Sequence, residues 1–245
     1  MTEDSRSREL AAALTATRER IAAAEAAAGR ASGSARLMIV TKFFPAEDLA
    51  RLVRLGADEF GENREPEAGR KVAQVRTELP EADFTMDMIG SVQRKKARTI
   101  ARWARRVQSV DSAELTEALA SAASKALDDG HRSTPLGVLL QISLDGDPAR
   151  GGVVAEQLPA LAEQVRGHDG ALSLDGLMVI APLHGQAAEH LAHAQRIAED
   201  FRRDHPEAVE LSSGMSGDLE TAVEFGSTCV RVGTAIMGPR PLVSP

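Results

Sequence analysis

Eight short apolar runs alternate with amphipathic segments along almost the whole of this 245-residue chain. Apolar runs of this length, bounded by turn residues, are typical of buried strands, and apolar positions at helical spacing indicate helices between them. Eight β/α units predict a closed (β/α)8 barrel of the TIM type, and a doubly wound open sheet is the alternative. The expected strands span residues 37–41, 59–61, 85–89, 107–110, 136–143, 174–180, 209–212 and 228–232.

One further helix is expected before the first strand, over residues 8–28, where it would cover an end or a side of the barrel. Asp111 and Glu114 form a capping pattern that predicts the start of a helix after the fourth strand. No repeat or long low-complexity tract divides the sequence, so residues 1–245 are expected to form one domain.

Composition excludes several classes of protein. With 43% hydrophobic residues the chain can bury a large core, and its one cysteine, Cys229, suits a reducing compartment. No uncharged apolar run approaches a membrane span, so we expect a cytoplasmic protein without membrane association. The net charge of -7 argues against a general nucleic-acid-binding surface. His190 and His193 are interpreted as surface residues of a helix, and no metal site is expected.

A lysine and two late loops provide the candidate site. Lys42 ends the first expected strand, and small residues follow the seventh and eighth strands. Closing a barrel pairs strand eight with strand one, and phosphate often binds in the loops after strands seven and eight. A lysine amine that faces a phosphate site is what a Schiff base with pyridoxal 5'-phosphate (PLP) requires. The candidate cofactor-binding residues are Lys42, Asn63, Ser212, Ser216, Arg231, Gly233 and Thr234.

Each candidate has a chemical reason. The amine of Lys42 can bond to an aldehyde, while hydroxyl groups and backbone amides in the two loops can donate to a phosphate dianion. Ser216 is expected to cap a helix whose positive end points at this anion. A guanidinium stays protonated, so Arg231 beside the pyridine nitrogen would donate to it and make the ring a weak electron sink.

Several short motifs, in this order and spacing, resemble those of the pyridoxal phosphate homeostasis proteins. They are Val40-Thr41-Lys42, Phe60-Gly61-Glu62-Asn63, Ile89-Gly90 followed by Gln93 and Lys96, Arg150-Gly151-Gly152, Leu177-Met178, Gly214-Met215-Ser216 and the run from Val230 to Ile236. The resemblance covers roughly residues 37–240 and implies a barrel similar to the N-terminal domain of alanine racemase.

The resemblance also implies a role for each candidate residue. Lys42 would hold PLP as the Schiff base, Arg231 would face the pyridine nitrogen, and Asn63 would lie near the ring. The phosphate would be bound by Ser212, Ser216, Gly233 and Thr234. The chain departs from the family pattern at the rim of this site: at the segment 64–67, at Met86-Asp87 and at Ser213.

Three functions are compatible with these features. The first is a PLP carrier or buffer in intracellular PLP homeostasis, which binds PLP without substantial catalysis. The second is a fold type III racemase or a related amino-acid enzyme, and the third is a barrel enzyme that acts on a phosphorylated metabolite without PLP. We favour the carrier, because a two-base racemase uses a tyrosine opposite its lysine and these 245 residues contain none. Residues 236–245 are also too few to build the C-terminal β domain of such racemases. The expected partners are PLP and PLP-dependent apoenzymes, and the expected state is a monomer or weak dimer.

Three other features could bear on the site. The basic run 94–106 is interpreted mainly as a solvated helix face, and Trp103 within it as either a core residue or a stacking platform. Arg150 lies in a loop expected to be a solvated turn, with contact to the mouth of the barrel as the alternative. His184 follows the sixth strand and could contact a ligand.

Overall fold

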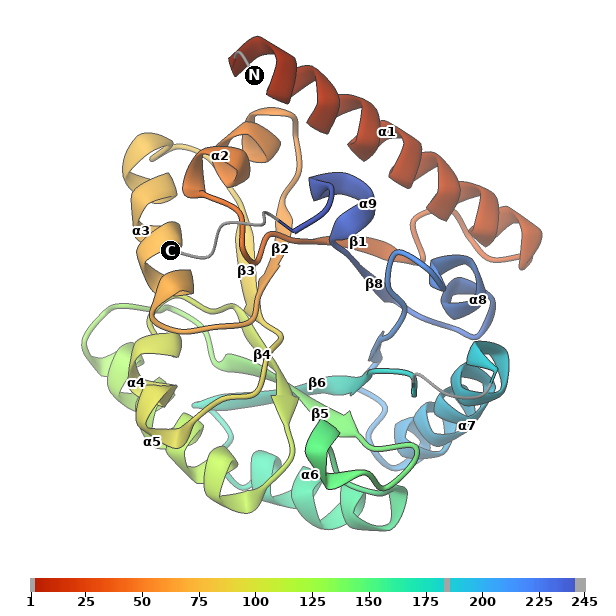
Figure 1. The fold of residues 1–245 in the computed structure, drawn as a ribbon. Coiled ribbons are helices and arrows are strands. Elements are labelled where there is room, and N and C mark those ends of the chain that lie inside the picture. Colours follow the sequence, from red (N-terminus) through yellow and green to blue (C-terminus); the bar gives the residue numbers. More distant parts are fainter. Residues whose placement is uncertain (1–2, 183–185, 241–245) are drawn as a thin grey trace.

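The computed structural model describes residues 3–182 and 186–240, and in it eight parallel strands close into a barrel in the order β1 to β8 (Figure 1). The predicted (β/α)8 barrel is therefore confirmed, and the open-sheet alternative is wrong. The eight predicted strands all exist, with ends within two residues of those expected. The strands are β1 Arg36–Val40, β2 Glu59–Glu62, β3 Thr85–Met88, β4 Arg106–Val110, β5 Leu136–Ile142, β6 Leu172–Val179, β7 Glu210–Ser212 and β8 Cys229–Val232.

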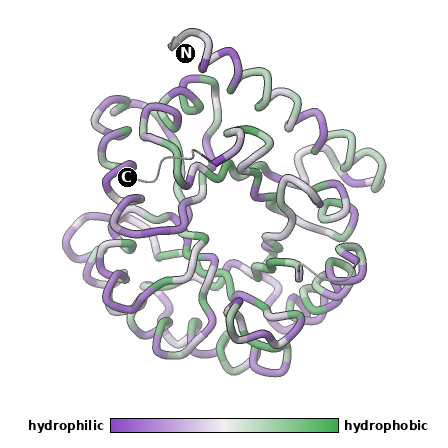
Figure 2. Tube along the Cα trace, in the orientation of Figure 1, coloured by the Kyte–Doolittle hydropathy of each residue, from purple (hydrophilic) through white to green (hydrophobic). Residues whose placement is uncertain are grey.

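Helices surround the barrel, and the buried strands are the more apolar part of the chain (Figure 2). Parallel strands covered by helices lose contact with water on both sides, which explains their near-continuous apolar runs. The α-helices are α1 Glu3–Ala27, α2 Ala46–Arg54, α3 Glu67–Glu78, α4 Ala97–Ile100, α5 Ala113–Asp128, α6 Leu158–Arg166, α7 Ala187–Asp204, α8 Leu219–Glu224 and α9 Thr234–Met237. Short 3-10 helices are η1 Arg94–Lys96, η2 Pro148–Arg150 and η3 Ala155–Gln157.

Closure of the barrel pairs β1 with β8. Met38 lies opposite Arg231, and Ile39 lies opposite Val232. On the other side of β8, Ser212 of β7 lies opposite Cys229. The two ends of the chain thus form adjacent strands, which places the loops that follow β7 and β8 beside the end of β1.

The extra helix α1 covers one side of the barrel, where it packs mainly on α8 and α9 (Figure 1). Arg20 of α1 donates to the carbonyl oxygen of Ser216 at 3.2 Å and forms an ion pair with Glu220. The predicted helix is therefore confirmed, although it begins at Glu3 rather than at residue 8. Through Arg20 it also supports the loop that follows β7.

Two predicted helix caps are wrong. The N-cap of α5 is Ser112, whose hydroxyl accepts from the amide of Leu115, while the Asp111 carboxylate accepts from the amide of Gly152. The N-cap of α8 is Asp218 rather than Ser216. A tight turn precedes α8, because the Asp218 carboxylate accepts from the amide of Met215. This turn separates Ser216 from the helix it was expected to cap.

In the described ranges, no helix has the length and apolar character that crossing a membrane requires.

Candidate functional site

Lys42 lies just beyond β1, at the end of the barrel where the strands have their carboxyl ends. Its side chain is half-buried, and its Nζ atom lies 5.7 Å from the centre of the Phe43 ring. Within the described part of the chain, no hydrogen bond or ion pair is made by this amine. Phe43 has a φ of 72°, a left-handed conformation that is uncommon for a bulky residue. Strain of this kind often marks functional positions, and here it turns the chain sharply after Lys42.

Arg231 of β8 is the buried cation of the site, with 6% of its surface exposed. Its Nη1 donates to the Ser212 hydroxyl at 2.6 Å, and its Nη2 donates to the carbonyl oxygen of Val179 at 2.7 Å. No described residue accepts from its Nε atom. Burial lowers the pKa of Arg231, but a guanidinium still keeps its charge at neutral pH.

A chain of hydrogen bonds inside the barrel fixes the direction in which Arg231 and Ser212 interact. Gln108 of β4 donates its amide Nε2 to the Asp87 carboxylate at 2.7 Å, so its carbonyl Oε1 faces the other way. The Ser212 hydroxyl donates to this Oε1 at 2.7 Å, and its oxygen is left to accept from Arg231. Because a carboxylate can only accept, it sets the direction of every bond in the chain. The Ser212 oxygen is thereby kept free to accept from Arg231, which can only donate.

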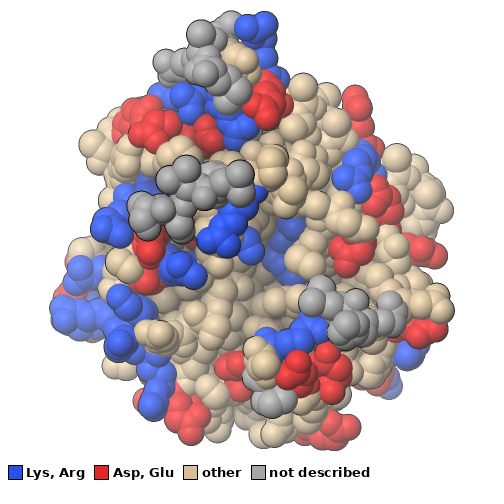
Figure 3. Space-filling model, viewed as in Figure 1, with Lys and Arg blue, Asp and Glu red and all other residues tan. Residues whose placement is uncertain are grey.

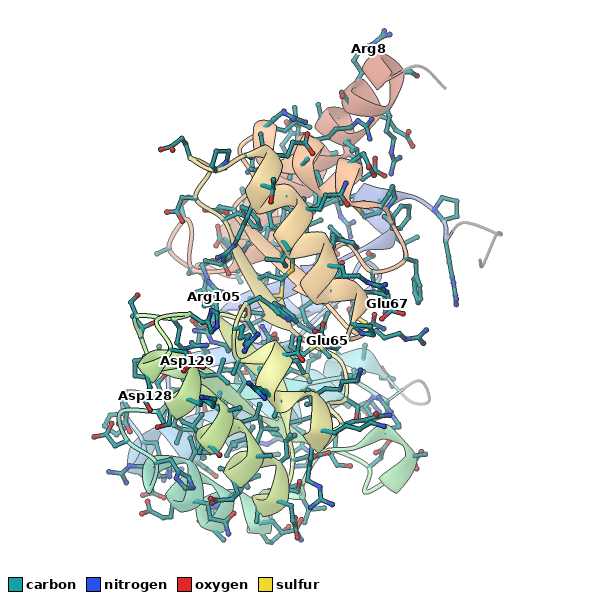
Figure 4. The ribbon with its side chains drawn as sticks, turned by 90° about the vertical axis from the view of Figure 1, so that its left-hand side faces the viewer. Arg8, Glu65, Glu67, Arg105, Asp128 and Asp129 are labelled. Atoms are coloured by element: carbon teal, nitrogen blue, oxygen red, sulfur yellow. The ribbon has the colours of Figure 1, made fainter. Side chains whose placement is uncertain are left out.

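The same network continues to the opposite end of the barrel. Asp87 accepts two hydrogen bonds from Arg105, which also pairs with Glu59. Figure 4 shows Arg105 toward the side of the molecule opposite Glu67, whose helix α3 begins at the mouth. Burial alone would lower the pKa of Arg105, but Asp87 and Glu59 outweigh it and raise that pKa. The ion pairs of Arg105 with Asp87 and Glu59 therefore hold in place the hydrogen-bond chain that leads to Arg231.

The loops after β7 and β8 meet at the mouth of the barrel. The Ser216 hydroxyl accepts from the amide of Ala235 at 3.3 Å, which joins the two loops. Gly214 has a φ of 88°, and a Cβ atom there would lie 2.4 Å from that of Ala222, so the turn requires glycine. Gly233 lies close to β1: a Cβ atom added to it would lie 3.4 Å from the carbonyl oxygen of Val40. Thr234, the first residue of α9, is exposed.

Asn63 directly follows β2 at this mouth and is half-buried. The loop after β3 packs tightly against it, since a Cβ atom on Gly90 would lie 2.3 Å from the carbonyl oxygen of Asn63. Gly90 is held in turn by the Ser109 hydroxyl, which donates to its carbonyl oxygen at 2.6 Å. The position of Asn63 therefore depends on a glycine in the neighbouring loop.

The mouth forms a hollow in the face shown in Figure 3, with Lys and Arg atoms visible around and within it. The structure brings six of the predicted residues to this end of the barrel: Lys42, Asn63, Ser216, Arg231, Gly233 and Thr234. The hydroxyl of Ser212 is instead fully buried between Arg231 and Gln108. This hydroxyl supports Arg231 directly, and a contact of Ser212 with phosphate stays a prediction.

Arg150 also reaches the end of the barrel, as the alternative interpretation of its loop predicted. It donates to the carbonyl oxygens of Ile180 and Ala181, just beyond β6, and pairs with Asp145. It thereby secures the loop after β5 against the strand next to it. His184 was interpreted as a loop histidine without a role, with ligand contact as the alternative, and it lies outside the described residues.

The basic run is only partly a solvated face. Arg94, Lys95 and Arg98 are exposed, whereas Trp103 is buried and belongs to the core. Arg105 and Arg106 were expected to be solvated and are instead ion-paired, with the Asp87 and Asp175 carboxylates among their partners. Among the described residues no group of three or more metal-ligating side chains comes together.

The buried polar residues Asp87 and Gln108 were missed as parts of the site, together with Glu62 and Lys71. A signal existed for two of them, because an acidic residue in β3 and a glutamine in β4 interrupt otherwise apolar strands. Buried polar groups in such strands need partners. The partners themselves come from other strands and helices, so the sequence does not identify them.

A family model described as "Alanine racemase, N-terminal domain" matches residues 13–241, and this defines the class of barrel. A pyridoxal phosphate homeostasis protein of Mycobacterium bovis is 46% identical over 249 residues, which are 98% of this chain and 96% of the relative. The chain therefore belongs to the family of pyridoxal phosphate homeostasis proteins, within the class that the barrel defines.

Solved structures agree with this assignment. PipY of Synechococcus elongatus, solved with PLP bound, is 30% identical with a TM-score of 0.76, over 94% of this chain and all of that one (100%). Alanine racemase of Corynebacterium glutamicum is 17% identical with a TM-score of 0.64, and the alignment covers 98% of this chain and 62% of the racemase. The likeness to the racemase is one of fold alone.

Proposed function

We propose that this protein binds PLP at the carboxyl ends of its strands, with Lys42 as the covalent attachment point, and serves intracellular PLP homeostasis. The observation that carries the proposal is the arrangement at the mouth. The half-buried Lys42 amine has no described hydrogen-bonding partner and lies at the same end of the barrel as the joined loops of Ser216 and Thr234. The names of the relatives and the PLP bound to PipY support it.

The chemistry of the described donors fits PLP. The Ser216 and Thr234 hydroxyls and the amides beside Gly233 are suited to a phosphate dianion. Arg231 has a free Nε donor and no bonded carboxylate among the described residues, which suits the lone pair of an unprotonated pyridine nitrogen. Ser212 contributes by holding Arg231.

When bound, PLP supplies an aldehyde to which a neutral lysine amine can bond with loss of water. The protein's part is to place the groups. Lys42 presents its amine at the end of β1, and Arg231 holds a proton where the ring nitrogen would accept a hydrogen bond. The loops of Ser216 and Thr234 fix the position of the anion. Asn63 lies on the other side of β1, where it would lie near the ring.

We infer that the protein holds PLP for other proteins rather than using it in rapid catalysis. PLP-dependent apoenzymes are the recipients that we propose, with the protein acting as one cytoplasmic domain in a monomer or weak dimer. The weak electron sink produced by Arg231 supports this function over an amino-acid racemase. So does the buried state of Cys229, which leaves no reactive thiol there as a second base.

The first test is borohydride reduction of the PLP-loaded protein, followed by peptide mapping. We expect a pyridoxyl group on Lys42 and none in the Lys42→Ala variant. The matched control is Lys125→Met, which alters an exposed lysine of α5 paired with Asp129 at 3.2 Å. A label on another lysine of the wild-type protein would disprove the assignment.

The second test separates a carrier from a racemase. The PLP-loaded protein is mixed with L- or D-alanine in heavy water, and exchange of the α-proton is followed by NMR together with chiral analysis. We expect exchange far slower than about 1 per second, the low end of ordinary turnover. Faster turnover that Lys42→Ala abolishes would establish the racemase alternative.

A further inference from the structure

A second lysine, Lys71, is buried beside the chain segment that carries Lys42. Its Nζ donates to the carbonyl oxygen of Thr41 at 2.9 Å and forms a short ion pair with Glu62. The Thr41 hydroxyl donates to the same Glu62 oxygen at 2.7 Å. Three residues, Thr41 just beyond β1, Glu62 of β2 and Lys71 of α3, therefore form one cluster, in which the side chains of Lys71 and Glu62 are only 10% and 4% exposed.

The position of this cluster follows from the fold. Glu62 is the last residue of β2, which pairs with β1, and Lys71 lies in the second turn of α3. Helical side chains point back toward the N-terminus of their helix, and the N-terminus of α3 is at the mouth of the barrel. The long side chain of Lys71 thus reaches the end of β1 from outside the strand.

The cluster immobilises the peptide that precedes Lys42. The amide of Thr41 donates to the carbonyl oxygen of Gly61 at 3.2 Å, and the carbonyl oxygen of Thr41 accepts from Lys71 at 2.9 Å and from the amide of Phe44 at 3.1 Å. Thr41 itself is fully buried. Every polar group of this residue is therefore bonded, directly before Lys42 and two residues before the left-handed Phe43. An ordinary strand end does not require every polar group to be bonded in this way, because the loop that follows it tolerates movement.

The ion pair of Lys71 and Glu62 costs free energy of folding, so its presence needs an explanation. A buried ion pair is seldom the most stabilising choice, because both ions lose their hydration. An apolar pair of similar size would pack this gap at least as well. This cost is explained if the residue after Thr41, which is Lys42, must be held in a fixed geometry.

We propose that Lys71 and Glu62 are positioning residues for Lys42, holding the peptide of Thr41 so that the Lys42 amine meets the aldehyde of PLP. This inference rests on the proposed function, since it presumes attachment at Lys42. Misplacement of reacting atoms by about 1 Å can lower a rate roughly 100-fold without affecting binding elsewhere. Loss of the pair therefore acts on attachment and leaves recognition of the phosphate and ring intact.

The test compares two ligands. PLP carries the aldehyde, whereas pyridoxine 5'-phosphate has a hydroxymethyl group in its place and cannot be attached. For the double variant Glu62→Gln with Lys71→Met, which leaves no unpaired buried charge, we expect covalent attachment of PLP to slow roughly 10- to 100-fold. Absorbance in a stopped-flow instrument measures the rate. Affinity for pyridoxine 5'-phosphate, measured by calorimetry, should change less than about twofold, because its donors lie in other loops.

Two further variants refine the result. Lys71→Arg keeps the charge and the donors and should restore a large part of the rate, while Lys125→Met should behave as wild type. Thr41→Val removes one hydroxyl but keeps the ion pair, so it reports on the same peptide even where the double variant does not fold. It should slow attachment in the same direction by a smaller factor.

Equal weakening of both ligands in a folded variant, or an unchanged attachment rate, would overturn the proposal and leave the pair a purely structural one. Borohydride mapping of the wild-type protein separates this failure from failure of the proposed function. A wild-type label absent from Lys42 refutes the function itself. A wild-type label on Lys42, with variants that attach PLP normally, refutes only the positioning role.

Discussion

Replacing Ser212 with alanine is expected to destabilise the protein far more than removal of a small hydroxyl suggests. The Ser212 side chain is fully buried, accepts from Arg231 and donates to Gln108. The variant leaves both of these groups buried without this partner, and an unsatisfied buried group costs about 1–3 kcal/mol, with charged groups toward the upper end. We therefore expect the free energy of unfolding to fall by about 2–4 kcal/mol.

Urea denaturation of the PLP-free protein measures this change, read as a lower midpoint at an unchanged slope. For a domain of this size the melting temperature should fall by roughly 5–15 °C. The matched control is Ser216→Ala, because that hydroxyl is half-buried and only accepts one long bond, at 3.3 Å, from Ala235. We expect the control to lose less than about 1 kcal/mol. A loss for Ser212→Ala no larger than that of the control would refute the buried chain as the function of Ser212.

Three further outcomes are expected. The double variant Ser216→Ala with Thr234→Ala should weaken binding of PLP much more than binding of pyridoxal, measured by fluorescence titration; equal losses would remove these loops from phosphate recognition. Burial, together with the nearby carboxylates of Glu59 and Asp87, raises the pKa of the Cys229 thiol to about 12, so a disulfide reagent should modify it only upon unfolding. Burial alone would raise the pKa of Glu59, but its two arginine partners outweigh it and lower that pKa below the ordinary 4.5. The ionised Glu59 therefore stabilises the fold above its ordinary pKa, and this stability is lost as the pH falls through the lowered pKa. In urea titrations, the difference in free energy of unfolding between the wild-type protein and Glu59→Gln should become smaller from neutral to acidic pH.

The strands and the closure of the barrel could be predicted because they depend on local patterns. Continuous apolar runs such as Leu136–Ile142 have few alternatives to a strand buried on both faces. Once eight such strands alternate with helices, the pairing of β8 with β1 follows from closure, whereas the register that places Arg231 opposite Met38 does not. The position of Lys42 relative to the late loops was predictable for the same reason, since it required topology and no side-chain geometry.

Side-chain partners could not be predicted in this way. In the sequence, Ser212 has the character of a loop serine suited to phosphate. Only the structure shows that the side chain of Gln108, from β4, accepts from its hydroxyl. Lys71 looks like a surface lysine of an amphipathic helix, yet it is 10% exposed and paired with Glu62. Both cases depend on contacts between residues far apart in sequence. Periodicity identifies which face a residue occupies but not which polar group it meets there.

The direction of the buried hydrogen bonds connects the fold to the proposed function. The Asp87 carboxylate can only accept, so Gln108 must donate to it and must accept from Ser212, which in turn must accept from Arg231. A guanidinium has no acceptor, so Arg231 can present only a donor to a ring nitrogen, and the buried chain keeps Ser212 oriented to hold it there. A carboxylate in direct contact with that nitrogen would favour its protonated form and strengthen the electron sink, whereas no described carboxylate is hydrogen-bonded to Arg231, and the chain of bonds reaches Asp87 only through Ser212 and Gln108. A ring nitrogen that meets only a donor is a weak electron sink, which supports the proposed carrier over a racemase.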